Sequence, residues 1–238
     1  MEAICELNGE QVYRDGTGYW SNSWRYPRSS RILDIMDLPG LDKWRANVGT
    51  DKAEEISSQS RDIGHEIHRI INELDTGRLR FAGADDPRWT MLTPEIKNGL
   101  ICWQQAQKYF KWTGVASELL MVSHKYGYAC MTDRVLKING ELEIFDWKSR
   151  KNVLTDGYSE HFPQIVAKIK MQLASYWHAF EEMTGKTIAR ARAIPLYIDR
   201  GFWTKDDQIV LEKADFQDYF DGFLGLKKVY NLVYGWRK

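Results

Sequence analysis

Cysteine is scarce in this chain of 238 residues, and its three copies lie far apart. Cys5, Cys102 and Cys130 form no CxxC pair, so the sequence predicts neither a disulfide framework nor a zinc site. An iron–sulfur cluster usually needs four thiolates, which three cysteines do not supply. We therefore expect all three to be small buried hydrophobic residues, and we expect no iron–sulfur cluster.

Long apolar runs are also missing. No run approaches the roughly 20 residues that a membrane-spanning helix needs, so a membrane partner is not expected. The stretch from Met1 to Gln11 is polar and acidic, unlike a signal or transit peptide. The expectation from these absences is a cytoplasmic protein.

An excess of charge of either sign is lacking, with 33 basic and 33 acidic residues. A long non-specific nucleic-acid surface would more often give a basic excess. Acids at a metal site with bases around them can also sum to zero, so this balance neither indicates nor excludes nucleic acid. The ten tryptophans and twelve tyrosines suit base stacking on a single strand, although packing is the expected role of any one of them.

The first half of the chain is predicted to be mainly helical. Residues 7–30, rich in Gly, Tyr, Ser and Trp, predict a short hairpin followed by a loop. Apolar residues at helical spacing predict a long helix over 51–74. A second helix over 94–112 should end at Gly114. The remaining expectations are short helices over 29–36 and 41–46, a loop over 78–93, and a buried helix face made of Ile96, Leu100, Trp103 and Tyr109.

The pattern changes to strands after residue 114. Short apolar segments predict antiparallel strands over 116–123, 128–138 and 142–146, with Asn139–Gly140 as a two-residue hairpin turn. The later elements are expected to be a helix over 162–183, a strand over 188–198, a short strand over 209–211 and a helix over 215–234. This order predicts an α/β (α+β) fold, with a mixed central β-sheet and helices on both sides.

The residues most suited to chemistry lie in the predicted hairpin. Asp133 is in one strand, and Asp146 and Lys148 end the next. Mg²⁺ typically takes one or two carboxylates plus waters and phosphate. Lys148 is two residues from Asp146 and therefore shares its strand face, where it can position an attacking water or neutralise a phosphate. An acid–x–lysine triplet is also common on solvated hairpins, and that alternative stays open for the triplet alone.

Other side chains are candidates for the same site. Glu118 begins the preceding strand, and His68 lies on the long helix, where an imidazole suits Mn²⁺. Gln172 and Tyr176 are spaced i,i+4 and share one helix face. Each also has an ordinary structural explanation, as a solvated or satisfied polar group.

Taken in order, these residues resemble the PD-(D/E)xK nuclease superfamily in its RecB-like exonuclease branch. The N-terminal part is most similar to phage exonucleases related to the mitochondrial genome maintenance exonuclease. The segments that carry the resemblance span residues 26 to about 180: Tyr26-Pro27-Arg28-Ser29-Ser30, Leu41-Asp42-Lys43-Trp44, Gly64-xxx-His68, Glu118, Gly127-Tyr128 leading to Asp133, Asp146-Trp147-Lys148-Ser149 and Gln172-xxx-Tyr176.

The resemblance implies a restriction-endonuclease-like sheet with an N-terminal helical arch. It implies one nuclease domain over 1–238, with a hairpin and helical region at 1–113 and a catalytic core at 114–238. One or two Mg²⁺ or Mn²⁺ ions would bind there. The implied roles are Asp133, Asp146, Lys148 and Glu118 as catalytic residues, Asp133, Asp146, His68 and the Trp147 backbone carbonyl as metal ligands, and Gln172 and Tyr176 as supporting residues. Relatives often carry an acid four residues after the histidine, where this chain has Asn72.

The resemblance implies a metal-dependent DNA exonuclease acting on single strands with a free end, in a bacterial or phage-infected cytosol. Alternatives are a double-strand exonuclease or structure-specific endonuclease for recombination or repair, a catalytically inactive DNA-binding relative, and an unrelated globular domain. The candidate DNA contacts are Ser149, Arg150 and Lys151, with Lys186, Arg190 and Arg192 as further phosphate-binding candidates. For each of these bases, an ordinary solvated surface charge is the favoured alternative.

Overall fold

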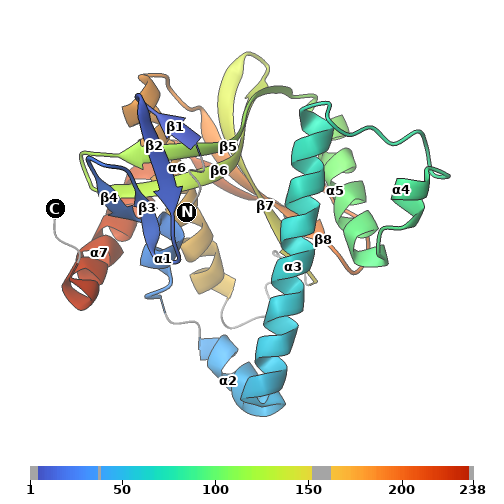
Figure 1. Ribbon diagram of the computed structural model, residues 1–238, viewed down its shortest axis with the longest axis horizontal. Coiled ribbons are helices and arrows are strands. Elements are labelled where there is room, and N and C mark those ends of the chain that lie inside the picture. The colour runs from blue at the N-terminus through green and yellow to red at the C-terminus, as the bar shows by residue number, and fades with distance from the viewer. Residues whose placement is uncertain (1–4, 37–38, 152–161, 236–238) are drawn as a thin grey trace.

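The computed structural model describes residues 5–36, 39–151 and 162–235 (Figure 1). Its centre is a five-stranded sheet in the order β5-β6-β7-β8-β9. The strands are β5 (Thr113–Ser123), β6 (Tyr128–Ile138), β7 (Glu141–Arg150), β8 (Arg190–Tyr197) and β9 (Ile209–Glu212). Only the β7–β8 pair is parallel, and the other three pairs are antiparallel. The predicted mixed α/β fold is therefore confirmed.

The turn between β6 and β7 is the one that the sequence predicts. Asn139 and Gly140 have φ angles of 49° and 91°, the positive values that a tight two-residue hairpin turn requires. The predicted strand over 142–146 was too short, because β7 continues to Arg150 alongside β8. That extension keeps Lys148 in regular strand geometry.

The N-terminal residues form a second, four-stranded antiparallel sheet of β1 (Cys5–Leu7), β2 (Glu10–Arg14), β3 (Gly18–Trp20) and β4 (Arg25–Pro27). The prediction of one hairpin followed by a loop was therefore wrong for β3 and β4. Strands of three residues are too short to display a period of two. The Asp15 carboxylate also closes the β2–β3 turn by accepting hydrogen bonds from the backbone N–H groups of Thr17 and Gly18, at 2.7 and 2.8 Å.

The predicted helices are present as α1 (Ser29–Leu33), α2 (Pro39–Val48), α3 (Thr50–Asp75), α5 (Pro94–Phe110), α6 (Phe162–Thr184) and α7 (Phe216–Tyr234). The predicted loop over 78–93 contains a short helix, α4 (Pro87–Thr90). Helix α5 ends at Lys111, whose φ is 51°, rather than at Gly114. Tyr109 is 54% exposed, so its predicted place in the buried face is wrong, and Ala106 is buried instead.

Two apolar clusters cover the two faces of the central sheet. Helices α1, α6 and α7 pack on one face, and α3 and α5 on the other (Figure 1). The N-terminal sheet packs on β5 and β6 through a third cluster: Val12, Tyr19, Leu120, Val122 and Ala129. Period-two alternation explains the division, because Ile144 of β7 joins the α6 face while Phe145 and Trp147 join the α3 face.

The sheet divides into two arms at one point. The β6–β7 ladder runs from Ile138↔Glu141 to Arg134↔Phe145 and stops there. Beyond it, β6 stays paired with β5 as far as Tyr128, while β7 stays paired with β8 as far as Arg150. We call this point the fork. Asp133 and Asp146 are the next residues on the two strands, so the fork brings together the two acids that the sequence singled out.

Helix α2 and the first half of α3 project beyond the sheet, next to the fork (Figure 1). In the described ranges, no helix is both long enough and apolar enough to cross a bilayer.

Candidate active site

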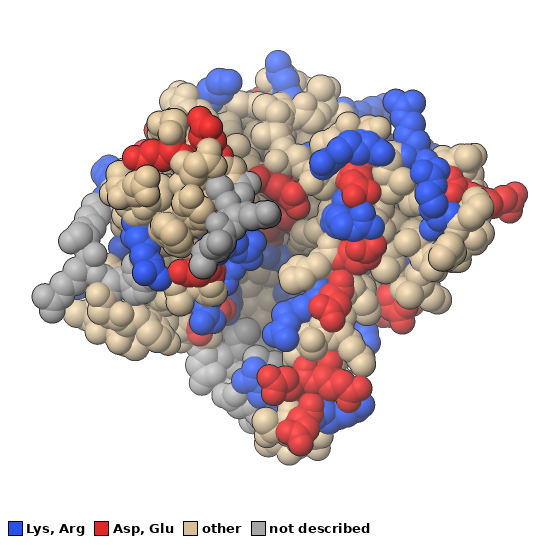
Figure 2. Space-filling model, in the orientation of Figure 1, with Lys and Arg blue, Asp and Glu red and all other residues tan. Residues whose placement is uncertain are grey.

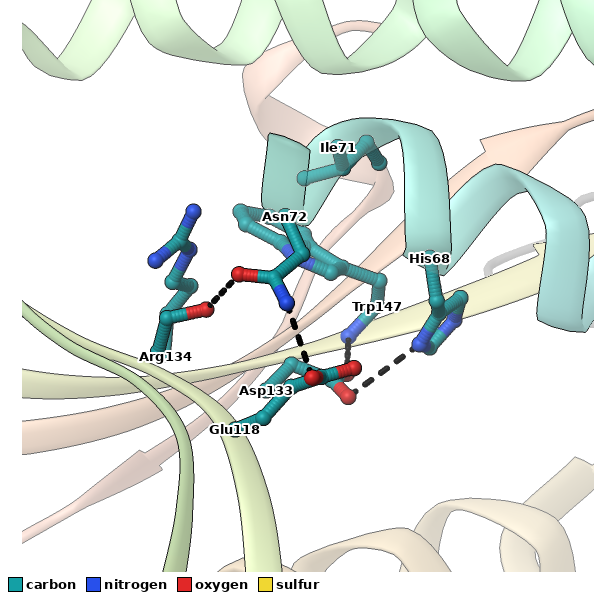
Figure 3. A pocket seen from close by; sticks show the side chains of 8 residues that line it. His68, Ile71, Asn72, Glu118, Asp133, Arg134 and Trp147 are labelled. Carbon is teal, nitrogen blue, oxygen red and sulfur yellow. Dashed lines mark hydrogen bonds and ion pairs between the residues drawn. The ribbon is translucent and has the colours of Figure 1, made fainter. Parts of the chain in front are cut away.

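Asp133 is fixed by two hydrogen bonds at the fork (Figure 3). Its Oδ1 lies 3.1 Å from Nδ1 of His68 on α3, and its Oδ2 accepts a 2.6 Å hydrogen bond from the backbone N–H of Trp147. Burial raises the pKa of Asp133, but His68 and the Trp147 N–H favour the carboxylate and bring that pKa below its ordinary value. Burial likewise opposes the charged form of His68, and Asp133 outweighs it, so the pKa of His68 is raised. The predicted neighbours Asp133 and His68 are thus in contact.

Asp146 begins a chain of polar contacts on the α6 face of the sheet. Its Oδ2 lies 2.6 Å from Nζ of Lys148, as expected for residues two apart on a strand. Lys148 Nζ donates to Gln172 Oε1 at 2.8 Å, and Gln172 Nε2 donates to the hydroxyl of Tyr176 at 2.6 Å. The two pairs that the sequence spacing predicted, Asp146 with Lys148 and Gln172 with Tyr176, are therefore joined by the contact between Lys148 and Gln172.

The charge on Asp146 is costly in this position. Asp146 is only 5% exposed, and burial raises the pKa of its side chain despite the neighbouring Lys148 ammonium. Burial also keeps the pKa of Tyr176 well above its usual range, so Tyr176 stays a neutral phenol. The site thus holds two carboxyl groups whose pKa values shift in opposite directions, downward for Asp133 and upward for Asp146.

Glu118 joins the site through Asn72 (Figure 3). Asn72 lies on α3 one turn after His68, and its Nδ2 donates to Glu118 Oε2 at 2.8 Å. Ser117 Oγ donates to Asn72 Oδ1. Glu118 has a φ of 46°, which is uncommon for a residue with a side chain. In the sequence, Asn72 was notable only because relatives often carry an acid at this position. Its spacing of four residues from His68 puts both side chains on the same helix face and could have indicated a role in the site.

A small cavity separates these groups. It measures about 10 Å³, and its lining includes His68, Asn72, Glu118 and Asp133 together with the apolar side chains of Ile71 and Trp147. A volume of that order is at the lower limit for one water molecule. The space between α3 and the fork is therefore suited to a single small polar or ionic species.

A buried ion pair anchors the end of α3 beside the acids. Arg134 pairs with Asp75, the last residue of α3, and their side chains are 5% and 10% exposed. Arg134 follows Asp133 and points to the opposite face of β6. This pair could not be predicted from the sequence, because 59 positions separate its members along the chain and neither lies in a recognised motif.

The candidate DNA-contacting residues differ in burial and in the side of the strand on which they lie. Arg150 shares a strand face with Lys148 by alternation, and burial lowers its pKa. Ser149 points toward α3, where a Cβ at Gly64 would lie 3.5 Å from its Oγ. Lys151 and Lys186 are exposed.

Arg190 and Arg192 do not face the site, which corrects their prediction as phosphate-binding residues. Both pair with the buried carboxylate of Glu143, at 3.6 and 2.6 Å. Arg192 also lies over the ring of Phe110, on the α3/α5 face of the sheet. Because β8 pairs in parallel with β7, Arg190 and Arg192 lie on the sheet face opposite to Asp146. There they neutralise the buried Glu143.

The donor set at the fork fits a hard divalent ion in kind. It offers two carboxylates and one imidazole, and Mg²⁺ needs only one or two carboxylates. Among the residues that the structure describes, no group of three or more His, Cys, Asp or Glu side chains is arranged as a ready-made metal cluster. Lys148 and His68 instead occupy carboxylate oxygens of Asp146 and Asp133. An ion would therefore compete with these contacts.

Comparisons with known proteins do not assign a family. No family model matches the chain, and no curated protein matches it. One similar solved structure is that of a "putative exonuclease" from Eubacterium rectale, with 10% identity and a TM-score of 0.47, covering 74% of this chain and 69% of that one. Another is that of SSO0001, with 13% identity and a TM-score of 0.37, covering 91% and 78%. Likenesses of this extent carry no argument about activity, which has to come from the site itself.

Proposed function

We propose that this chain is a metal-dependent nuclease that hydrolyses phosphodiester bonds of DNA, acting from the ends of single strands. The observation that supports it most is the meeting of Asp133, Asp146 and Lys148 at the fork, held by His68 from α3 and by Gln172 from α6. Five polar side chains from four elements converge there, on a sheet whose other interior positions are mainly apolar. The resemblance to PD-(D/E)xK nucleases, drawn from the order of the same residues, points to the same chemistry.

Asp133 and Asp146 would hold one or two Mg²⁺ or Mn²⁺ ions, with His68 and the Trp147 backbone carbonyl as further ligands. Such an ion, when bound, polarises the scissile phosphate and lowers the pKa of a coordinated water. The depressed pKa of Asp133 keeps its carboxylate charged and ready for a cation. The raised pKa of Asp146 reflects an anion without enough compensating charge, which a cation would supply.

Lys148 would act on the attacking water and on the charge that develops on the phosphate. Its ammonium has three donors, of which the contacts to Asp146 and Gln172 use two. Within the described ranges no other contact uses the third donor, which could serve the water or a phosphate oxygen. Gln172 orients the ammonium, and Tyr176 in turn holds the Gln172 amide. Fixed donors of this kind stabilise transition-state charge without reorganisation.

The preference for strand ends rests on the projecting helices. Helix α2 and the first half of α3 project beside the sheet (Figure 1), and we assign them as the helical arch that the resemblance implies. An arch over the site would admit a single strand that has a free end and exclude a duplex. Circular single strands would then resist cleavage while linear ones are degraded.

The test is degradation of 5′-labelled linear single-stranded DNA by the purified chain with Mg²⁺ or Mn²⁺. EDTA should stop it, and Asp146→Ala or Lys148→Ala should lower the rate by at least ~100-fold without loss of the folded circular-dichroism spectrum. Lys137→Ala is the matched control, because Lys137 is an exposed lysine on β6, four residues from Asp133. Unchanged cleavage in either site variant would overturn the assignment, and cleavage of circular strands would make the enzyme an endonuclease.

A further inference from the structure

A second, larger cavity opens from the candidate active site toward the N-terminal sheet. Its volume is about 320 Å³, and Asp133, Gln172 and Tyr176 line it at the catalytic end. Arg14 and Arg28 line it from the N-terminal sheet. The volume lies in the range of ordinary ligand sites, about 300–1,000 Å³. The cavity thus joins the acids of the fork to two arginines that have no part in the proposed chemistry.

The N-terminal sheet places both arginines. Arg14 is the last residue of β2, and Arg28 directly follows β4. A bridge between Arg28 and Ala129 ties β4 to β6, the strand that carries Asp133. The space-filling view shows a hollow between the N-terminal sheet and α3, with Lys and Arg side chains at its sides (Figure 2). The N-terminal sheet, predicted only as a hairpin and a loop, therefore forms one wall of this hollow.

The two guanidinium groups lack an acidic partner. Within the described part of the chain, neither Arg14 nor Arg28 forms an ion pair with a carboxylate. Arg28 donates from Nη2 to the backbone oxygen of Gly16 at 3.1 Å, and its buried Nε has no hydrogen-bond partner there. Arg14 is exposed, 5.9 Å from the centre of the Tyr19 ring. Burial and the charge of Arg14 lower the pKa of Arg28 more than the nearby Asp34 raises it, and a bound anion would offset both effects.

The nearest competing acids are already occupied. Asp34 lies between Arg31 and Lys168, at 3.6 and 3.4 Å. Glu118, which also lines the cavity, accepts a hydrogen bond from Asn72. The cavity therefore has an acidic end, suited to a cation, and a basic end, suited to an anion. Ser30 and His65 add further polar groups between them.

We infer that Arg14 and Arg28 bind a phosphate of the nucleic-acid strand next to the one that is cleaved, with the intervening nucleotide in the cavity. The inference rests on the proposed function and extends it by a substrate-binding subsite. Guanidinium groups are the usual partners of phosphate because their paired N–H donors match two of its oxygens. The bound phosphate is either a terminal 5′-phosphate or an internal phosphodiester, which share this chemistry.

The experiment measures binding without turnover. A fluorescent single-stranded oligonucleotide is titrated with protein in EDTA, with either a 5′-phosphate or a 5′-hydroxyl end. Arg14→Gln and Arg28→Gln should each weaken binding by ~10-fold and lower the slope of log affinity against log salt by about 0.7. Arg31→Gln is the control, because it removes the same charge from the next helix without lining the cavity and should change affinity by less than ~2-fold.

The two ends of the oligonucleotide separate the two sources of phosphate. An effect confined to the 5′-phosphorylated strand assigns a terminal phosphate, and an equal effect on both assigns an internal phosphodiester. Arg28→Lys, which keeps the charge, should recover part of the affinity, and Arg14→Gln carries the test if Arg28→Gln fails to fold. Wild-type affinity in Arg14→Gln and in a folded Arg28→Gln overturns the subsite. Loss of binding together with absent cleavage in the wild type would instead refute the nuclease proposal and leave the anion site standing.

Discussion

Asp133 Oδ2 accepts a 2.6 Å hydrogen bond from the backbone N–H of Trp147, across the point where β6 and β7 separate. In an unbroken ladder that N–H would face another backbone group. Here the Asp133 carboxylate accepts the hydrogen bond instead of a backbone carbonyl. The β6–β7 ladder therefore ends at the position of this acid. The hydrogen bond orients Asp133 toward His68 and leaves Asp146 on the α6 face beside Lys148. The fork therefore builds the candidate site.

Divalent cations should stabilise the folded protein. An ion that binds only the native state at ten times its Kd raises the unfolding free energy by about 1.4 kcal/mol. We expect Mn²⁺ to raise Tm in the wild type and to have no effect on Asp133→Asn. The control is Asp85→Asn, an exposed acid in the α3–α5 connection, which should keep the shift. A shift of equal size in Asp133→Asn would place the ion elsewhere.

Gln172 should act by holding Lys148 rather than by touching substrate. Gln172→Leu removes the 2.8 Å contact with Lys148 Nζ, and we expect kcat to fall by ~10-fold or more with little change in KM, as for other residues that orient a catalytic group. Tyr176→Phe, which removes only the partner of the Gln172 amide, should have a smaller effect. Steady-state kinetics on single-stranded DNA measures both. A larger loss in Tyr176→Phe than in Gln172→Leu would contradict this order of contacts.

Breaking the buried Asp75–Arg134 pair from one side should destabilise the folded protein strongly. Removing one member leaves the other charge buried, which typically costs about 3–5 kcal/mol. We therefore expect Arg134→Met or Asp75→Asn to lower the unfolding free energy by that order, and the double variant Asp75→Leu/Arg134→Met to lower it by less than the sum. Urea denaturation measures each value. Arg31→Met, from an exposed pair with Asp34, should cost less than about 1 kcal/mol.

Cys5 is only partly buried, so the expectation of three buried cysteines is wrong for Cys5, and thiol reactivity should separate it from the other two. Burial raises the pKa of Cys102 to about 11 and that of Cys130 well above its ordinary value. A thiol with a pKa of about 11 is one part in roughly a thousand thiolate at pH 8, and the thiolate is the reactive form. In a thiol-reagent assay at pH 8, Cys5 should react in the native protein, and all three should react in denaturant. Fast native labelling of more than one thiol would contradict this burial.

The helices and the sheet could be predicted because their signals are local. The repeated isoleucines of α3, the Asn139–Gly140 turn and the apolar run of β6 each act over a few residues, and the structure confirms them. The boundaries of β7 and the strands β3 and β4 could not be predicted. They depend on pairing with β8 and with neighbouring short strands, which supply hydrogen bonds that no single segment encodes.

In the candidate site, too, some contacts could be predicted from local sequence and others depend on distant segments. Residue type and strand period alone predicted that Lys148 would share a face with Asp146, and the 2.6 Å contact confirms it. The positions of the arginine side chains could not be predicted in this way. In sequence, Arg190 and Arg192 look like phosphate contacts, but parallel pairing of β7 and β8 turns them toward the interior acid Glu143. Arg14 and Arg28 carried no such signal, yet the N-terminal sheet brings them to the cavity beside Asp133.

By itself, then, the sequence determined which residue types are available and which of them share a strand or helix face, because these follow from fixed periods of 2.0 and 3.6 residues. Tertiary structure alone decided where the ladder between β6 and β7 ends, which helix reaches each acid, and which arginines pair with an interior carboxylate. Those outcomes depend on packing between segments far apart in the chain, where burial sets the cost of every unpaired charge.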